Sequence, residues 1–421
     1  MGGVAGHLSH LHENLDFTFG EIKSILSDVA KANIEAVEKV DGQNVFFTWH
    51  AGTGALHTAR NNSDIKKGGM SPEEFAGKWK GHPAEDAFMN GFDAIERAVS
   101  RLGEDTLLDI FGANGDNWVN SEIMYHGNPN IINYGGDWIV LHNMQSFGDS
   151  GEAAINNSAF GALVSAVQSA ESELDEQGFR ISGPQMVELE DLTNGLAYED
   201  FISELDGATG MTDGATIRDY VEEQLRAGPI GSVPLPVHQQ EELIKIILDM
   251  EGAPKYADFK KSVPKEHHKL VSTLATKTNK RKIIAKMVIP VETAISNFAI
   301  EVLRGMQSFF VGDHDKEIER MRKEVEDSIS QLQSAQGEDA EKMAAMLEKQ
   351  MEKLGPIENV ASTMEGIVFE HPPGSRQLYK LTGSFAMANQ IIGRARRMPK
   401  EETVEEAVLR KYVRSWIGVI G

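Results

Sequence analysis

Apolar and polar residues are arranged along the first 150 positions in patterns that predict both strands and helices. Residues 17–32 follow the period of an amphipathic helix, with Ile22 and Ile25 on its apolar face, and a further helix is expected over 84–102. Short apolar runs bounded by turns predict strands at 34–40, 44–50, 55–60, 118–126 and 137–144. This part of the chain therefore predicts a body that mixes strands and helices.

Beyond residue 150 the apolar spacing becomes mostly helical. Helices are expected over 151–176, 197–227, 237–250 and 290–310. Residues 316–354 predict a helical hairpin, because two apolar stripes run from Ile318 to Leu332 and from Met343 to Leu354, with the sequence SAQGED as the turn. Strand pattern returns at 364–370 and 376–383, and helices are expected from there to the end.

The whole pattern predicts an α+β protein whose strand-containing body is split by roughly 210 mostly helical residues. We expect three segments: 1–150, a helical insertion at 151–360, and 361–421, which returns to the first segment and ends in a short helical tail. The chain has no internal repeat and no low-complexity tract.

Composition excludes several classes of protein. The 421 residues are enough for two or three domains, and none of them is cysteine. Disulfides, thiolate catalysis and cysteine zinc sites are therefore excluded, and the absence of cysteine fits a reducing cytoplasm. No run of about 18 apolar residues is present, and the N-terminal sequence lacks the basic start and apolar core of a signal peptide. We therefore expect a cytoplasmic protein with no membrane partner.

The formal net charge of −23 argues, taken alone, against binding to nucleic acid. The charge is uneven, however. Residues 254–288 carry ten Lys and Arg but only two acids, and residues 393–400 add four more bases. The candidate contacts with backbone phosphates are Lys277, Lys280, Arg281 and Lys282. A solvated helix face that balances acidic neighbours is the alternative.

The sequence EKVDGQN at 38–44 places a lysine beside an acid, a glycine and two amides. A lysine amine attacks an electrophile only when it is unprotonated, so a catalytic Lys39 needs a site that lowers its pKa. Gly42 would let the backbone approach a ligand closely, and Asp41 and Asn44 would supply polar contacts. The alternative for Lys39 is a surface lysine before an Asp-Gly turn.

Four further motifs follow EKVDGQN in a fixed order: TARN (58–61), WVNSEIMY (118–125), MEGIVFE (364–370) and LYKLTG (378–383). Together the five resemble the motifs of the covalent nucleotidyltransferase superfamily, which contains ATP-dependent RNA ligases, DNA ligases and mRNA capping enzymes. In that family the first lysine, matched by Lys39, attacks the α-phosphorus of a nucleoside triphosphate. The other matching positions are Arg60, Glu122, Glu365 and Lys380.

The resemblance has two departures and covers less than half of the chain, roughly 17–147 and 361–393. Leu141 and His142 occupy the place of the usual Phe-Asp pair, so the residue that stacks on the base is not identified. Thr382 stands where the family has a second lysine, which weakens the expected phosphate clamp.

The resemblance implies a nucleotidyltransferase core of antiparallel sheets, like that of an ATP-grasp-like ligase, interrupted by a large helical insertion. It also implies ATP as substrate and Mg²⁺ or Mn²⁺ as cofactor, with Lys39 as nucleophile and Glu365 at the metal. The implied nucleotide-binding residues are Glu38, Asp41, Gly42, Asn44, Arg60, Glu122, Glu365 and Lys380.

Within the family, Asn44 favours RNA ligases of the phage type, because DNA ligases tend to have arginine at that place. Only about 38 residues follow LTG, too few for the OB-fold appendage of DNA ligases and capping enzymes. We expect an ATP-dependent RNA ligase that joins 5′-phosphate and 3′-hydroxyl ends, acts as a monomer on RNA rather than DNA, and works in the cytoplasm, or in the host cytoplasm if phage-encoded. A DNA ligase, a capping guanylyltransferase and a non-catalytic nucleic-acid-binding member are the alternatives.

Three other groups of side chains have a functional interpretation and an ordinary one. His7, His10 and His12 are candidate metal ligands, or residues of an exposed terminal segment. Lys66 and Lys67 follow Arg60 closely and are candidates for phosphate contact, or surface charges. The histidines of KEHHK, at 265–269, are expected to lie on a solvated basic face.

Overall fold

The computed structural model describes residues 8–127, 129–147, 153–171, 178–193, 197–334, 340–375 and 377–396. The chain divides into two compact units, one formed by Met1–Ile318 with Ala361–Phe385 and the other by Glu319–Val360 with Ala386–Gly421. The described residues are 51% helical and 16% strand, and their sheets are largely antiparallel, which confirms the expected mixture of helix and antiparallel sheet.

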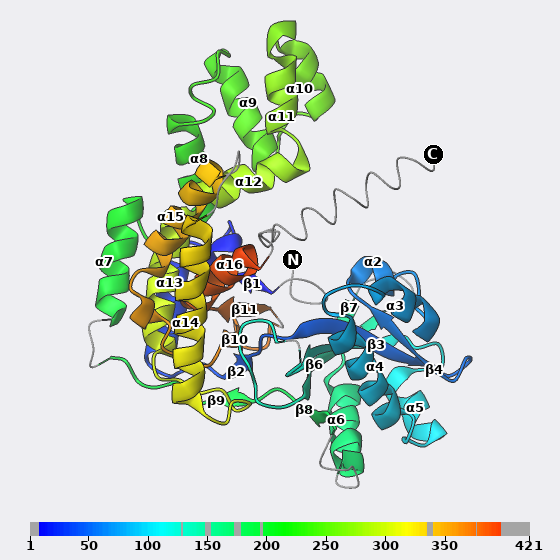
Figure 1. Cartoon of the computed structure of the whole chain (residues 1–421). Helices are drawn as coiled ribbons and strands as arrows, with labels where there is room; N and C mark the ends of the chain where they lie inside the picture. Colours follow the sequence, from blue (N-terminus) through cyan, green and yellow to red (C-terminus); the bar gives the residue numbers. More distant parts are fainter. Residues whose placement is uncertain are drawn as a thin grey trace, which may run out of the picture. The chain divides into compact units, whose positions relative to one another are not determined.

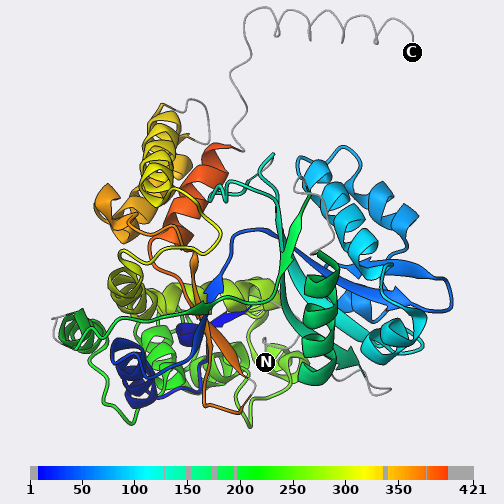
Figure 2. The same cartoon turned by 90° about the horizontal axis from the view of Figure 1, so that it is seen from below.

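The first sheet joins strands from both ends of the chain. Its order is β1 (Ser9–His10), β11 (Leu378–Leu381), β10 (Gly366–Glu370), β2 (Ala36–Lys39) and β9 (Met186–Val187). Strand β10 is antiparallel to both β2 and β11. In Figure 2 the orange strands from the C-terminal part accordingly lie beside the blue strand from the N-terminal part. The expected return of residues 361–421 to the first segment thus takes the form of a shared sheet.

The second sheet is antiparallel except for one short strand. Its order is β4 (Ala55–Ala59), β3 (Gln43–His50), β5 (Asn117–Met124), β6 (Trp138–Phe147) and β7 (Ala153–Ile155), and β8 (Arg180–Ser182) pairs in parallel with β6. Between β2 and β3, residues 40–42 carry the chain from the first sheet to the second (Figure 1). The sequence KVDG therefore lies where the two sheets meet.

One face of the first sheet is packed against helices. Ile367, Phe369 and Leu381 on that face are at most 2% exposed and join a core with Phe19 and Phe298. The helices that contribute to this core are α1 (Phe19–Ala30), α7 (Ala197–Thr209), α8 (Ile217–Ala227), α9 (Val237–Ile247) and α13 (Ile289–Leu303). The helical insertion thus buries one face of the sheet and leaves the other face to Lys39 and its neighbours.

The second sheet has its own core. Phe47 of β3 packs with Phe75, Phe88 and Phe111, all of them at most 1% exposed, from helices that cover the sheet in Figure 1. These helices are α3 (Pro72–Trp79), α4 (Glu85–Val99), α5 (Glu104–Phe111) and α6 (Asn157–Glu171), and α2 (Asn62–Ile65) is a single turn after β4. Helix α3 begins at Pro72 behind a capping box formed by Ser71 and Glu74, which explains its sharp start.

The remaining elements of the first unit are short helices. They are α10 (Tyr256–Ser262), α11 (His268–Leu274), α12 (Lys277–Met287) and the 3₁₀ turns Leu11–Glu13 and Lys265–His267. No single helix in the described ranges is long and apolar enough to cross a membrane.

The structure corrects two of the expected boundaries. Residues 151–176 are not one helix, because β7 precedes α6; β8 and β9 then join the sheets, so the strand-containing body continues to Val187 and not to 150. The helix expected over 197–227 is two helices, α7 and α8, separated at Gly210, which has a φ of +65°. The sequence pattern missed β7, β8 and β9 because strands of two or three residues are too short to show a period.

The second unit contains the expected hairpin, α14 (His314–Gln333) and α15 (Ala340–Leu354), followed by the 3₁₀ turn Ile357–Asn359 and by α16 (Phe385–Ala395). Arg396 binds Glu324 at 2.5 Å, and the Gln331 side chain donates to the Ala395 carbonyl at 3.3 Å, so α16 packs on the hairpin. Most of the expected SAQGED turn, His7 and the predicted C-terminal helix beyond residue 396 lie outside the described residues.

Candidate active site

The centre of the site is an ion pair between two of the motif residues. Lys39 is the last residue of β2 and lies opposite Gly366 of β10, so Glu365 is its neighbour across the sheet. The Nζ atom of Lys39 lies 2.7 Å from Oε2 of Glu365, and the two side chains are 16% and 12% exposed. Lys39 is thus a partly buried ammonium held by a carboxylate 326 positions away.

Three carboxylates keep Lys39 charged. Burial opposes its charge, but Glu365, Glu122 and Asp41 outweigh burial and raise the pKa of Lys39 above its ordinary value. Burial also raises the pKa of Glu365, with Asp41 and Glu122 adding to the effect and Lys39 opposing it. Without ligands, therefore, Lys39 is protonated and cannot act as a nucleophile.

Glu122, on β5 of the second sheet, binds the crossover between the two sheets at Gly42. Its Oε1 accepts the Gly42 N–H at 2.8 Å, and its Oε2 lies 3.1 Å from Nε2 of His142. Burial raises the pKa of Glu122, but Lys39 and His142 outweigh burial and lower it, so Glu122 is ionised. The sequence did not predict His142 in this role; its place on β6, next to the strand of Glu122, was the available signal.

Gly42 is required by the contact between strands, and its expected close approach to a ligand stays a prediction. A Cβ atom at Gly42 would lie 2.7 Å from Cγ of Glu122 and 2.7 Å from the carbonyl oxygen of Ile123. Both distances are shorter than real Cβ contacts allow, so a side chain here would push β5 away from the crossover.

Lys380 shares the face of the first sheet that carries Lys39. Lys380 lies opposite Val368, and Val368 lies opposite Val37, so these three side chains line one face of the sheet. Val37 precedes Lys39 by two positions on β2, so Lys39 points to the same face. Lys380 is 9% exposed, and burial together with the charge of Lys39 lowers its pKa. The face therefore combines two lysines with an apolar floor.

Thr382 lies just beyond β11 at the position where the resembled family has a lysine. Thr382 is 6% exposed, and its Oγ1 atom is buried without a hydrogen-bond partner. Thr382 is thus a short side chain with an unused hydroxyl.

Arg60 is held by aromatic rings. Its guanidinium carbon lies 4.8 Å from the centre of the Phe88 ring and 5.3 Å from that of Trp79, and Nη1 is buried without a hydrogen-bond partner. Burial lowers the pKa of Arg60, while the carboxylates of Glu122 and Asp64 act in the opposite direction. An unpaired, fixed guanidinium is suited to an anionic ligand.

Asp41 binds the protein's own backbone, and its expected contact with the nucleotide stays a prediction. Its carboxylate accepts the N–H groups of Ile131 and Ile132 at 2.7 and 3.2 Å and the Asn130 amide at 3.3 Å. Its own N–H donates to the Tyr134 hydroxyl at 2.6 Å. Asp41 thus fastens the 125–136 loop to the crossover and contributes negative charge near Lys39.

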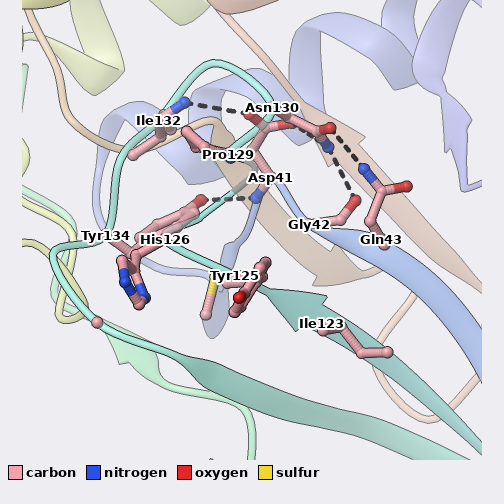
Figure 3. A pocket seen from close by; sticks show the side chains of 12 residues that line it. Asp41, Gly42, Gln43, Ile123, Tyr125, His126, Pro129, Asn130, Ile132 and Tyr134 are labelled. Carbon is pink, nitrogen blue, oxygen red and sulfur yellow. Dashed lines mark hydrogen bonds between the residues drawn. The ribbon is translucent and has the colours of Figure 1, made fainter. Parts of the chain in front are cut away.

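Figure 3 shows the pocket that this loop forms over Asp41, Gly42 and Gln43. The empty volume of the pocket, together with the open space at its mouth, is about 250 Å³. Sites for small ligands usually have 300–1,000 Å³. The pocket is therefore smaller than the usual site for a small ligand.

Asn44 also serves the fold. Its side-chain amide donates to Oδ1 of Asn120 at 2.6 Å and to the Ser121 carbonyl at 3.2 Å, which joins β3 to β5. The interpretation that Asn44 favours an RNA ligase over a DNA ligase stays a prediction.

Glu38 does not lie on the face of Lys39, and we withdraw it as a nucleotide ligand. It is 4% exposed and its Oε2 accepts the N–H of Phe309 at 3.0 Å, while Oε1 has no partner. Burial raises the pKa of Glu38 to about 7, although the contacts with Ser308 and Phe309 lower it. Adjacent strand residues point to opposite faces, which is why neighbours of Lys39 in sequence are not its neighbours in the site.

The basic residues of the insertion divide into two groups. Lys277, Arg281 and Lys282 of α12 are exposed. Lys280, in contrast, donates to the Ile246 carbonyl and binds Asp249 at 2.8 Å, with only 16% of its side chain exposed. Lys280 therefore ties α12 to the end of α9 and is withdrawn from the set of expected phosphate contacts.

Of the other candidates, His12 is only 8% exposed, so the expectation of an exposed terminal segment is wrong for this residue. Lys66 and Lys67 are exposed after α2. The rings of His10 and His12 stack with centroids 5.1 Å apart, and β1 places His10 opposite Lys380, which the sequence did not predict. The Nε2 atom of His268 lies 2.9 Å from the carbonyl oxygen of Val263.

The described residues contain no cluster of three or more His, Asp or Glu side chains suited to a metal ion. Mg²⁺ is nevertheless usually held by one or two carboxylates together with substrate phosphates and water. The Glu365 carboxylate, partly exposed beside Lys39, fits that mode as a single protein ligand.

Comparison of the chain with protein-family models, curated proteins and solved structures found no match. The function therefore has to be argued from the site itself.

Proposed function

We propose that the protein is an ATP-dependent polynucleotide ligase, acting on RNA, that forms a covalent lysyl-AMP intermediate on Lys39. One observation carries the proposal. Lys39 is a fixed, partly buried amine between Glu365 and Glu122, on the sheet face that it shares with Lys380.

In the first step, Nζ of Lys39 attacks the α-phosphorus of ATP. A nitrogen–phosphorus bond forms, the bond from the α-phosphorus to the bridging oxygen breaks, and pyrophosphate leaves. Lys39 must first lose its proton, which passes to solvent. A divalent cation beside Glu365 would supply positive charge that weakens the hold of the carboxylates on the ammonium and neutralises the triphosphate.

The other residues of the face position the nucleotide. Lys380, which is buried on this face, offers positive charge for the phosphates, and so does Arg60, which follows β4 and whose guanidinium lies against the Phe88 ring. Val37 and Val368 give an apolar floor between the two lysines on which a base can lie. In two further steps AMP passes to a 5′-phosphate, and a 3′-hydroxyl displaces it.

The exposed face of α12 is the proposed docking surface for the polynucleotide. Lys277, Arg281 and Lys282 lie on it with Lys286, and the helix contains no acid. Like charges at helical spacing repel one another, by about 0.2–0.5 kcal/mol per pair. A polyanion relieves that repulsion.

Incubation with α-labelled ATP or GTP, followed by a denaturing gel, tests the proposal. Label transferred from ATP supports a ligase, and joining of RNA in preference to DNA then supports an RNA ligase. Label transferred from GTP supports a capping guanylyltransferase instead.

A non-catalytic member that binds nucleic acid is the second candidate. It is favoured by Thr382 in place of a lysine and by the raised pKa of Lys39. This candidate predicts that neither nucleotide labels the protein while RNA still binds. Monomeric state and cytoplasmic location stay predictions.

A further inference from the structure

An aromatic cluster outside the nucleotide face contains the most exposed phenylalanine that the structure describes. The Phe309 side chain is 62% exposed, whereas its neighbour Phe310 is 4% exposed. The rings of Phe309, Phe310 and Trp138 meet edge to face, with centroids 5.1 to 6.2 Å apart. We call Phe309, Trp138 and Phe310 the aromatic platform.

The aromatic platform is fastened to both strands of the proposed active site. The Phe309 N–H donates to Glu38, the residue before Lys39, at 3.0 Å. The Ser308 N–H donates at 3.0 Å to Oγ1 of Thr363, two residues before Glu365. Because both anchors flank the Lys39–Glu365 pair, the platform is held at a fixed position relative to the reacting amine.

Arg180 adds a positive charge to the platform. Its guanidinium carbon lies 5.2 Å from the centre of the Trp138 ring, and Arg180 is exposed. Strand pairing of β8 with β6 sets Arg180 opposite Trp138. Within the described ranges no carboxylate pairs with this guanidinium. An exposed ring beside an exposed cation matches a nucleobase and its phosphate, since bases stack on aromatic rings and arginine planes and phosphates attract cations.

We propose that the aromatic platform stacks an unpaired base at the polynucleotide end to be joined, with Arg180 at the adjacent phosphate. This rests on the proposed ligase function and names its substrate more closely: an end that is single-stranded, because a paired base has no free face. The occupant is a base of the polynucleotide, not the adenine of ATP, because Glu38 and Phe309 lie on the side of β2 opposite to Lys39.

The test uses the full chain and two single-stranded RNAs of about ten nucleotides. One RNA carries 2-aminopurine beside its 5′ end, and the other carries it beside its 3′ end. Stacking quenches the fluorescence of this base, and anisotropy gives the affinity. The variants are Phe309→Ala, Phe309→Leu and Phe309→Tyr. Each keeps the backbone N–H that binds Glu38. Val237→Ala, at another exposed apolar residue (72% exposed), is the matched control.

The expected results separate stacking from a general apolar contact. Wild type should quench one of the two RNAs. Phe309→Ala and Phe309→Leu should lose the quenching and bind about 5- to 100-fold more weakly, the usual effect of removing one stacking ring. Phe309→Tyr and Val237→Ala should behave as wild type. Arg180→Gln should lower the slope of log affinity against log salt by about one.

Three outcomes would overturn the proposal: no quenching of either RNA, wild-type RNA affinity in Phe309→Ala, or wild-type affinity in Phe309→Leu. A rise in the ATP concentration needed for Lys39 adenylylation in Phe309→Ala would also overturn it, because the platform would then hold the adenine. If no variant and not even wild type forms an adduct, while the loss of RNA binding in Phe309→Ala persists, the platform stands and the ligase function fails.

Discussion

Replacement of Glu38 by glutamine should stabilise the protein, and by an amount that depends on pH. The pKa of Glu38 rises from 4.5 to about 7 on folding because the side chain is buried. Each pKa unit corresponds to about 1.4 kcal/mol, so ionised Glu38 costs the folded protein about 3 kcal/mol. Glutamine keeps an oxygen for the Phe309 N–H and carries no charge, and its amide can donate towards Ser308.

The direction in which the unfolding free energy changes with pH follows from proton binding. The folded protein holds the Glu38 proton more tightly than the unfolded chain does, so the free energy of unfolding falls as pH rises from about 4.5 to about 7 and then levels off. Glu38→Gln removes that fall. The difference in unfolding free energy, variant minus wild type, should therefore be small at pH 5 and reach about 3 kcal/mol at pH 8.

The assay is urea unfolding of wild type and Glu38→Gln at pH 5, 6, 7 and 8, followed by tryptophan fluorescence. Glu35→Gln, which removes one exposed charge from the same segment, is the control. The same difference at every pH, or the same pH dependence in both variants, would refute the reasoning that Glu38 is a buried acid whose ionisation strains the fold.

Three further predictions concern the proposed chemistry. Lys39→Ala and Lys39→Arg should fold but form no nucleotide adduct, because alanine has no amine and guanidinium stays protonated; intact-mass measurement after incubation with ATP checks this. Glu365→Gln should slow adduct formation at least about 100-fold, since the group that fixes Lys39 loses its charge; single-turnover labelling gives the rate. Replacement of Lys277, Arg281 and Lys282 by serine should weaken RNA binding and lower its salt slope by up to about three, with adduct formation unchanged.

Each of these predictions can fail in a distinct way. An adduct on either Lys39 variant removes Lys39 from the mechanism. A wild-type rate in Glu365→Gln removes the charge of Glu365 from it. For α12, serine replacement of Lys31, Lys80 and Lys316, which are equally exposed elsewhere and are not candidate phosphate contacts, is the charge-matched control. If both triple variants bind RNA alike at several salt concentrations, α12 is not a docking surface.

The sequence was a good guide to the longer elements. Strands of four or more residues, from β2 to β6 and at β10 and β11, were predicted near their observed positions, because four residues suffice to show alternation. Strands β1, β7, β8 and β9 have only two or three residues, and tertiary pairing alone defines them. This is why the helical insertion was expected to start too early.

The candidate site was predictable only where a side chain acts through its charge. Lys39 and Glu365 were expected together and lie 2.7 Å apart. Glu38 and Gly42 belong to the same motif, but the pleat of β2 turns Glu38 to the opposite face, and close approach of β5 explains Gly42. Lys280 was indistinguishable in sequence from its exposed neighbours, since its carbonyl and carboxylate partners come from a different helix.

The most direct test of the central claim is to locate the adduct. The protein is incubated with ATP and Mg²⁺, digested, and the peptides are sequenced by mass spectrometry. The account predicts one AMP, joined through a phosphoramidate to Nζ of Lys39, that disappears when pyrophosphate is added back. AMP on a different residue, or no AMP on any peptide from protein that binds ATP, would contradict it.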